Sequence, residues 1–102
     1  MVKNKILYRG KSVNKISVLA IDLGGESGRV IKMDFDGVKF YLEEIHRFPN
    51  LPVEASGTTY WDVLSLWREI QSGIAKSSSV NSLGVDSWGV DFALLDCHGK
   101  LL

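Results

Sequence analysis

Residues 15–29 read KISVLAIDLGGESGR, an apolar run that ends in an acid and leads into closely spaced glycines. The first eight of these residues are rich in Val and Ile, which predicts a buried strand ending at Asp22. Glycine-rich segments allow backbone angles that other residues avoid, and such angles are predicted for a turn at Gly24, Gly25 and Gly28. A loosely alternating segment over residues 29–35 then predicts a second strand.

The segments after this stretch predict another strand and a helix. Asp36-Gly37 is a two-residue hairpin signal, so residues 38–48 are expected to form a third strand in an antiparallel meander. Residues 49–59 are predicted to be a loop, because two prolines and a glycine disfavour a regular element there. Apolar residues at intervals of three or four predict a helix over residues 61–76. Asp62 and Lys76 lie where their charges complement the helix dipole.

The last quarter of the chain predicts two more strands. A polar linker over residues 77–81 precedes strands over residues 82–88 and 90–96. The predicted order is therefore β-β-β-α-β-β, which indicates an α/β fold class with a mixed sheet. The apolar pair Leu101-Leu102 begins an element that the sequence does not complete, and this leads us to expect a truncated domain.

Composition excludes several classes of protein. The chain has 102 residues, of which 45% are hydrophobic and 24% charged, as in ordinary globular proteins. No apolar run has the length of a membrane span, so a cytoplasmic protein without a membrane partner is expected. The single cysteine, Cys97, excludes an internal disulfide, and with two distant histidines it gives no metal-binding spacing. A catalytic role for Cys97 is disfavoured, because adjacent residues on a strand point in different directions.

Charge is unevenly distributed along the chain. Residues 1–15 form a basic leader with five Lys or Arg and no acid, whereas the remaining residues carry seven basic and twelve acidic side chains. A basic arm can bind nucleic acid, but this one has few charges and adjoins an acidic body that would repel phosphate backbones. The leader is therefore predicted to be a flexible segment with no nucleic-acid partner.

The glycine turn is a candidate anion site. Backbone N–H groups that converge in a turn attract anions, and a hydroxyl from Ser27 and a guanidinium from Arg29 would add donors to a phosphate. A carboxylate at Asp22, close to bound phosphates, suits Mg²⁺. The segment is not a Walker loop or a Rossmann fingerprint, because it leads into a strand. An ordinary tight turn with a solvent-facing Asp22 is an equally good interpretation of these residues.

A second distinctive stretch, DSWGVDF, covers residues 86–92. The aromatic face of Trp88 suits the apolar face of a sugar, and Gly89 would let a ligand approach the backbone closely. A buried Trp that packs a hairpin core is the alternative. His46 has no partner acid at an informative sequence spacing, so a structural or surface role is favoured over catalysis.

The two motifs together resemble those of sugar kinases of the FGGY class, and among these the rhamnulokinases. The strand ending in Asp22-Leu-Gly, followed by a Ser-Gly-Arg hairpin, is similar to the first phosphate motif of the actin and hexokinase superfamily. The segments 44–48 and 61–63 also fit. The resemblance implies that residues 16–102 form the N-terminal part of a kinase N-terminal domain, an incomplete actin-like ATPase (ribonuclease H-like) domain.

The resemblance also implies site residues and an activity. ATP contacts are implied for the hairpin residues Gly25, Glu26, Ser27, Gly28 and Arg29. A metal role is implied for Asp22, with Mg²⁺ as the ion, and a sugar contact for Gly89 beside Trp88. Glu26 departs from the family, which often has a small or hydroxyl residue there, so its carboxylate is expected to point away from the phosphates.

The implied reaction is transfer of the ATP γ-phosphate to the 1-hydroxyl of L-rhamnulose. The family's catalytic base lies beyond residue 102, so the chain alone is expected to be inactive and no catalytic residue is assigned within it. Two alternatives remain open. One is another FGGY kinase, acting on glycerol, xylulose or fuculose, and the other is a small non-catalytic binding module. The sequence does not predict an oligomeric state.

Overall fold

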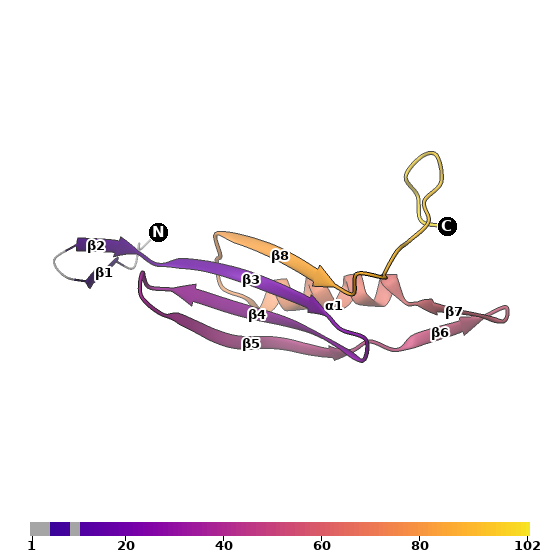
Figure 1. Ribbon diagram of the computed structural model, residues 1–102, viewed down its shortest axis with the longest axis horizontal. Coiled ribbons are helices and arrows are strands. Elements are labelled where there is room, and N and C mark those ends of the chain that lie inside the picture. Colours follow the sequence, from indigo (N-terminus) through magenta and orange to yellow (C-terminus); the bar gives the residue numbers. More distant parts are fainter. Residues whose placement is uncertain (1–4, 9–10) are drawn as a thin grey trace.

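The computed structural model describes the backbone of residues 5–8 and 11–102 and the side chains of residues 15–102. Its centre is a four-stranded sheet with the order β5-β4-β3-β8 (Figure 1). Strands β3 (Ile16–Leu23), β4 (Ser27–Phe35) and β5 (Phe40–Pro49) form an antiparallel meander. Strand β8 (Ser82–Ser87) pairs parallel to β3. The predicted meander and mixed sheet are confirmed.

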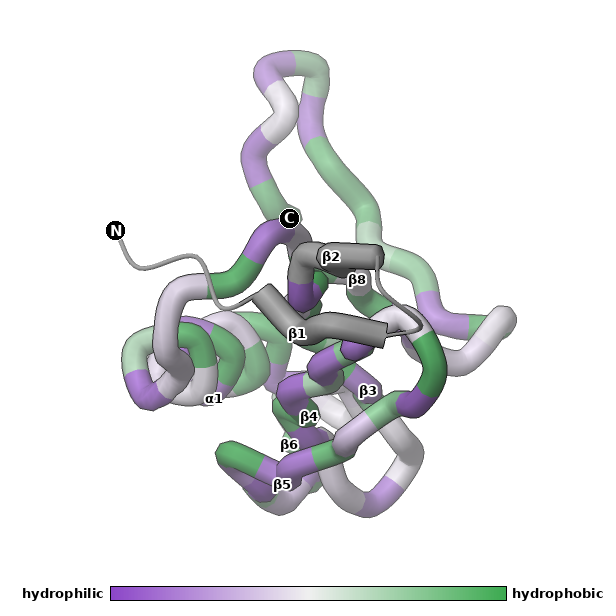
Figure 2. The backbone as a smooth tube through the Cα atoms, turned by 90° about the vertical axis from the view of Figure 1, so that its left-hand side faces the viewer, coloured by the Kyte–Doolittle hydropathy of each residue, from purple (hydrophilic) through white to green (hydrophobic). Residues whose placement is uncertain are grey.

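Helix α1 (Val63–Lys76) covers one face of this sheet, as the view along the long axis shows (Figure 2). The helix begins where the Asp62 carboxylate accepts a hydrogen bond from the Ser65 amide at 3.0 Å, which satisfies a donor that a helix start leaves free. Because strand side chains alternate between faces, every second residue of β3 points at the helix. The buried core contains side chains from three strands and the helix: Leu19, Ile21, Val30, Phe48 and Ile70.

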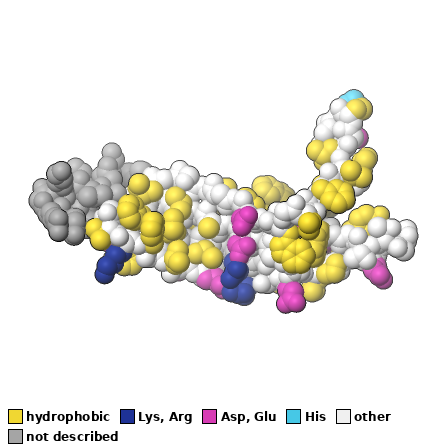
Figure 3. Space-filling view, viewed as in Figure 1, with side chains coloured by type: hydrophobic (Ala, Val, Ile, Leu, Met, Phe, Trp, Pro, Cys, Tyr) yellow, Lys and Arg dark blue, Asp and Glu magenta, His cyan; other side chains and the backbone are white. Residues whose placement is uncertain are grey.

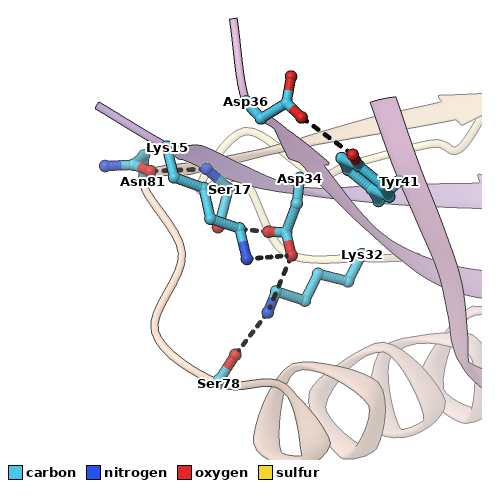
Figure 4. Close-up of polar contacts among 8 residues, drawn as sticks. All are labelled: Lys15, Ser17, Lys32, Asp34, Asp36, Tyr41, Ser78 and Asn81. Atoms are coloured by element: carbon cyan, nitrogen blue, oxygen red, sulfur yellow. Dashed lines mark hydrogen bonds and ion pairs between the residues drawn. The ribbon is translucent and has the colours of Figure 1, made fainter. Parts of the chain in front are cut away.

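A cluster of polar contacts fixes the connection from α1 to β8 (Figure 4). The Asn81 amide donates to the Ser17 carbonyl at 2.7 Å, and the Asn81 side chain accepts from the Ser17 amide at 2.8 Å. Lys32 donates to the Ser78 hydroxyl at 2.8 Å. These contacts explain the polar composition of residues 77–81, because they align the start of β8 with β3.

Asp34 holds the charged part of this cluster together. Its carboxylate accepts a hydrogen bond from Ser17 and pairs with Lys15 at 2.7 Å and Lys32 at 3.6 Å. Partial burial by itself raises the pKa of Asp34, but the hydrogen bonds from Lys15 and Ser17 and the charge of Lys32 outweigh it. The pKa of Asp34 therefore lies below its ordinary value of 3.8.

We expect Asp34→Asn to lower the free energy of unfolding by about 1–2 kcal/mol at pH 7. A depressed folded-state pKa adds stability above the unfolded-state value, and this stability is lost as the pH falls through the folded-state value. The difference between wild type and variant should therefore be constant above about pH 5 and shrink below about pH 4. Urea denaturation across this range measures it, with Glu43→Gln, an exposed acid on β5, as the control. A difference that does not change with pH would contradict the role of the charge.

The loop predicted for residues 49–59 is wrong. The segment contains strands β6 (Pro52–Ala55) and β7 (Thr58–Trp61), which form a separate two-stranded antiparallel ribbon. A proline that begins a strand in such a ribbon removes no central ladder bond. Ser56 and Gly57, with φ of 52° and 77°, form the two-residue turn, whose positive angles match the twist of the ribbon.

The last predicted strand, residues 90–96, is also wrong. The segment has no strand, and its only ladder contact is an isolated bridge between Leu95 and Leu101. Asp96 closes this loop by accepting hydrogen bonds from the amides of His98 and Lys100, both at 2.8 Å. The apolar composition of this segment did not produce a strand, because no neighbouring strand of the described chain offers a ladder to it.

Two smaller predictions differ from the structure in detail. The hairpin at Asp36-Gly37 has a four-residue loop, because Phe35 pairs with Phe40 and the Asp36 carboxylate accepts from the amides of Val38 and Lys39. The basic leader contains two paired strands, β1 (Lys5–Tyr8) and β2 (Lys11–Asn14). The flexibility predicted for residues 1–4 and 9–10 lies outside the described residues, and that of the leader as a whole stays a prediction.

The overall shape is elongated, with extents of 63 × 30 × 24 Å and a radius of gyration of 17.8 Å (Figure 1). A compact domain of this length has a radius of about 13 Å. Large apolar side chains are correspondingly exposed on β5, α1 and the final loop, for example Leu42, Leu64 and Phe92. No helix in the described part of the chain combines the length and hydrophobicity that crossing a membrane requires.

Candidate functional site

The candidate site lies where β3 and β8 end. Because the two strands are parallel and in register from Val18–Ser82 to Leu23–Ser87, their carboxyl ends reach the same edge of the sheet. The glycine turn follows β3 at this edge and the Trp-Gly segment follows β8 (Figure 1). Ligands of open α/β sheets bind at the carboxyl ends of such strands. The fold therefore brings together two motifs that lie about sixty residues apart in the sequence.

The glycine turn is held by a residue from another loop. Within the turn, the Gly24 amide donates to the Ser27 carbonyl at 3.0 Å. The Asn50 side chain donates to the Gly24 carbonyl at 2.8 Å, and the Asn50 amide donates to the Glu26 carbonyl at 2.9 Å. Asn50 is only 6% exposed, so these two hydrogen bonds from Asn50 to the glycine turn are shielded from solvent. No signal in the sequence points to Asn50, since a single Asn after Phe48-Pro49 resembles any loop residue.

The prediction that these glycines have unusual backbone angles is wrong. The left-handed glycines of the described chain are Gly37, Gly57 and Gly99, and none belongs to this turn. Close approach explains the glycines better. A Cβ on Gly25 would lie 2.2 Å from the Trp88 ring, and a Cβ on Gly28 would lie 2.2 Å from the Phe48 ring.

The turn still presents free backbone donors. Among the described residues, no group accepts a hydrogen bond from the amides of Gly25 or Glu26. The Glu26 side chain is exposed, and the Glu26 backbone carbonyl accepts a hydrogen bond from the Asn50 amide. Free amides in a tight turn are the kind of donor that binds an anion.

Asp22 and Arg29 form an ion pair beside this turn. They are opposite each other in the β3–β4 ladder, and Arg29 Nη2 donates to the Asp22 carboxylate. Asp86 is the partner of Asp22 on the other side, in β8. Since Ile21 points at α1, these charged residues lie on the uncovered face. Figure 3 shows acidic and basic side chains forming a narrow column across that face, with apolar side chains on both sides.

The charges of this column are mutually neutralised to a large extent. Asp22 and Arg29 side chains keep 35% and 39% of their exposure, so both remain accessible to a ligand. The Arg29 Nε is a buried donor with no partner in the described chain. On β5, two hydrogen bonds from Arg47 hold the pKa of Glu44 below its ordinary value. Arg29 therefore has a buried donor without a partner in the described chain, while its side chain as a whole stays partly exposed.

Trp88 lies against the glycine turn and is 53% exposed. The alternative of a Trp buried in a hairpin core is therefore not realised. The Trp61 ring meets Trp88 edge to face, with centroids 6.3 Å apart and planes at 86°, and Trp61 Nε1 donates to the Asp91 carboxylate at 3.1 Å. The space next to Gly89 is open, with no atom within 4 Å of where a Cβ would be. A half-exposed aromatic face beside open space is what a sugar site requires.

Several known proteins are similar to this chain in sequence. The chain is 45% identical over 92 residues to the rhamnulokinase of Bacteroides thetaiotaomicron, across 86% of this chain and 19% of that protein. The chain is thus similar in sequence to rhamnulokinases. It is 41% identical over 93 residues to the Mannheimia succiniciproducens rhamnulokinase, across 85% of this chain and 19% of the relative. It is 44% identical over 88 residues to the Halalkalibacterium halodurans rhamnulokinase, across 82% and 19%.

The chain spans about a fifth of the length of these rhamnulokinases. No protein-family model matches it. The similarity confirms the predicted resemblance to sugar kinases, while the roles of individual residues in the glycine turn and at Trp88 stay predictions.

His46 lies outside the candidate site of this rhamnulokinase relative. Its Nε2 is 2.7 Å from a Glu69 carboxylate oxygen, and its Nδ1 is 2.8 Å from Lys76 Nζ. The sequence offered no partner acid for His46, because Glu69 is 23 residues away and meets it only when α1 packs on β5. The contact joins strand and helix, which agrees with the structural role predicted for His46. Cys97 is exposed and free.

Proposed function

We propose that the chain supplies the phosphate-binding edge and one wall of the sugar site of a rhamnulokinase-type kinase. The proposed reaction transfers the γ-phosphate of ATP to the 1-hydroxyl of L-rhamnulose. The observation that carries the proposal is the contact between Gly25 and Trp88, which joins the phosphate motif to the sugar motif at one edge of the sheet. Similarity to rhamnulokinases covers most of the chain and supports it.

On the phosphate side, the chain contributes donors and one carboxylate. The amides of Gly25 and Glu26 would bind phosphate oxygens, with Ser27, Gly28 and Arg29 beside them. Asp22 fits a Mg²⁺ ion, because a partly exposed carboxylate next to a phosphate site is the ligand that this ion prefers. The ion would neutralise phosphate charge, as phosphoryl transfer requires.

On the sugar side, Trp88 provides a stacking face and Gly89 the open backbone. The neighbouring acid Asp91 is engaged by Trp61, so it orients the segment and leaves hydroxyl recognition to backbone groups and to the rest of the kinase. Phosphoryl transfer also needs both substrates to be positioned from two sides. We assign this chain one of those sides and no catalytic base.

The proposed setting is the cytoplasm, with ATP and L-rhamnulose as small-molecule partners. After residue 15 the chain carries five more acidic than basic side chains, from seven basic and twelve acidic residues. This balance disfavours a nucleic-acid partner.

A chimera tests the proposal. Residues 16–102 would replace the aligned segment of the Bacteroides rhamnulokinase, with the unmodified relative as control. We expect sugar-dependent ADP release with L-rhamnulose, and less with glycerol, xylulose or fuculose. A folded chimera that prefers one of these other sugars would assign a different FGGY substrate, and one that is inactive on all of them would favour a non-catalytic module. Turnover by the isolated 102-residue chain would contradict the absence of a catalytic base.

The isolated chain offers a second measurement. We expect ATP at millimolar concentration to shift the NMR signals of the Gly25 and Glu26 amides, because these donors have no partner among the described residues. The amides of Gly57 and Gly99, in turns away from the site, serve as controls. Equal shifts of all four amides would indicate non-specific binding instead.

A further inference from the structure

We propose that Trp88 couples the phosphate turn to the sugar wall, and that a brace formed by Trp61 and Asp91 positions it. This inference rests on the proposed function, since it assigns a means of communication between the two halves of that site. The sequence motifs include Trp61 and Asp91 but do not indicate their contact, because the two residues come from different segments and meet only in the fold.

The coupling element is the contact of the Trp88 ring with the turn backbone. Three atoms of the ring lie within 3.0 Å of the position that a Cβ on Gly25 would occupy, the nearest at 2.2 Å. The ring therefore fills the space that a side chain on Gly25 would take. Close-packed groups cannot move independently, so an anion that draws the turn amides toward it also shifts the ring.

The brace holds the ring from its other side. Trp61 ends β7 and contacts the Trp88 ring edge to face at 6.3 Å between centroids. Its indole N–H donates to Asp91 at 3.1 Å, and the Asp91 amide donates to the Trp88 carbonyl at 3.0 Å. Trp88 is thus connected to Asp91 by the chain and to Trp61 by packing, and the hydrogen bond closes the loop between them.

The brace makes the coupling directional. An exposed Trp on an irregular turn can adopt several rotamers. A ring that changes rotamer freely would not pass a shift of the glycine turn on to the sugar wall. The edge-to-face contact and the indole hydrogen bond both favour this one orientation of the ring. Binding of the phosphate tail at Gly25 would then fix the face of Trp88 that is presented beside Gly89. We therefore expect phosphate and sugar to bind with positive cooperativity.

Tryptophan fluorescence of the 102-residue chain tests this, with inorganic tripolyphosphate as the probe. Trp67→Phe removes the emission of the third tryptophan, an exposed residue of α1. In this background we expect a saturable change in emission with the same midpoint as the NMR shift of the Gly25 amide. Asp91→Asn keeps an oxygen acceptor for the indole and should preserve the change. Asp91→Ala removes the acceptor and should reduce its amplitude at least threefold, with the amide midpoint altered less than twofold.

The outcomes separate the two proposals. If the Gly25 amide titrates but the emission stays constant, or if Asp91→Ala behaves like Asp91→Asn, the coupling is refuted and the phosphate site stands. If the amide does not respond to tripolyphosphate, both are refuted. Trp61→Phe, which keeps a ring and loses the N–H group, provides a second variant should Asp91→Ala fail to fold as judged by circular dichroism. It should show the same loss of coupling.

Discussion

Gly73→Ala is expected to destabilise the protein by about 1–3 kcal/mol, the usual cost of overpacking a core. On an exposed helix the same substitution stabilises by about 1 kcal/mol, because Ala is the better helix former. Gly73 is buried where α1 crosses β4, and a Cβ there would lie 2.4 Å from Val30 Cγ2 and 2.9 Å from Val30 Cβ. Val30 is completely buried and cannot move aside. The steric clash with Val30 therefore outweighs the gain in helix propensity, and the net effect on stability is a loss.

Urea denaturation of Gly73→Ala and three further variants checks this expectation. Ala75→Gly, at an exposed position of the same helix, should cost about 1 kcal/mol through helix propensity alone. Val30→Ala makes room for the new methyl group, so the double variant with Gly73→Ala should be less destabilised than the sum of the single variants by about 1 kcal/mol or more. A Gly73→Ala protein as stable as wild type would contradict the close packing of helix on sheet.

Local signals in the sequence were sufficient for most of the sheet and for the helix. The run ending at Asp22 and the two segments after it form β3, β4 and β5, and every predicted boundary lies within two residues of the observed one. Their composition alone favours strands, and short turns force neighbours to pair. Asp62 was placed correctly at the helix start, because its chemistry there is local.

The failures have a common physical cause, which is that a strand depends on its partner. Residues 52–61 contain a proline and a glycine, yet they form a ribbon because the left-handed Ser56-Gly57 turn folds one half onto the other. Residues 90–96 are mostly apolar, five of the seven, but find no neighbouring strand to pair with. Sequence pattern records the preference of a segment and not the presence of the strand that would pair with it.

In the candidate site, too, the sequence predicts local features and not the long-range contacts between them. Asp22, the glycine turn and Trp88 were each identified from local composition. Their meeting depends on the parallel register of β3 and β8, which the Asn81–Ser17 contacts set at the opposite end of the sheet. The contacts of Asn50, Trp61 and Asp91 could not be predicted, because each joins residues more than twenty positions apart in sequence.

Asp22→Asn and Arg29→Met are expected to change tripolyphosphate binding in opposite directions when Mg²⁺ is absent. Asp22 repels an anion and occupies Arg29, so its neutralisation should tighten binding about fivefold, equivalent to about 1 kcal/mol. Arg29→Met removes the donor and leaves Asp22 unopposed, so binding should weaken by at least the same factor. The pair is partly exposed and contributes little to stability, so both variants should fold. Isothermal titration calorimetry of the 102-residue chain with tripolyphosphate measures the affinities.

The Asp34 cluster provides matched controls for the change in net charge. Asp34→Asn and Lys15→Met make the same changes of charge in the ion pair at the other end of the sheet, and neither should alter tripolyphosphate affinity more than twofold. If these controls changed the affinity as much as the site variants, the long-range electrostatic effect of net charge would explain the result. Arg29 would then have no specific role.

Magnesium is expected to reverse the effect of Asp22→Asn, and such a reversal would identify Asp22 as a metal ligand rather than a simple repulsive charge. With Mg²⁺ present, ATP brings a cation that a carboxylate attracts, so wild type should gain affinity for ATP on addition of the ion. Asp22→Asn should lose that gain while keeping its tighter binding of metal-free tripolyphosphate. In the chimeric kinase the same substitution should lower kcat/KM about a hundredfold, since neutralisation of phosphate charge is needed most in the transition state. An Asp22→Asn chimera with wild-type turnover would assign the metal to another carboxylate.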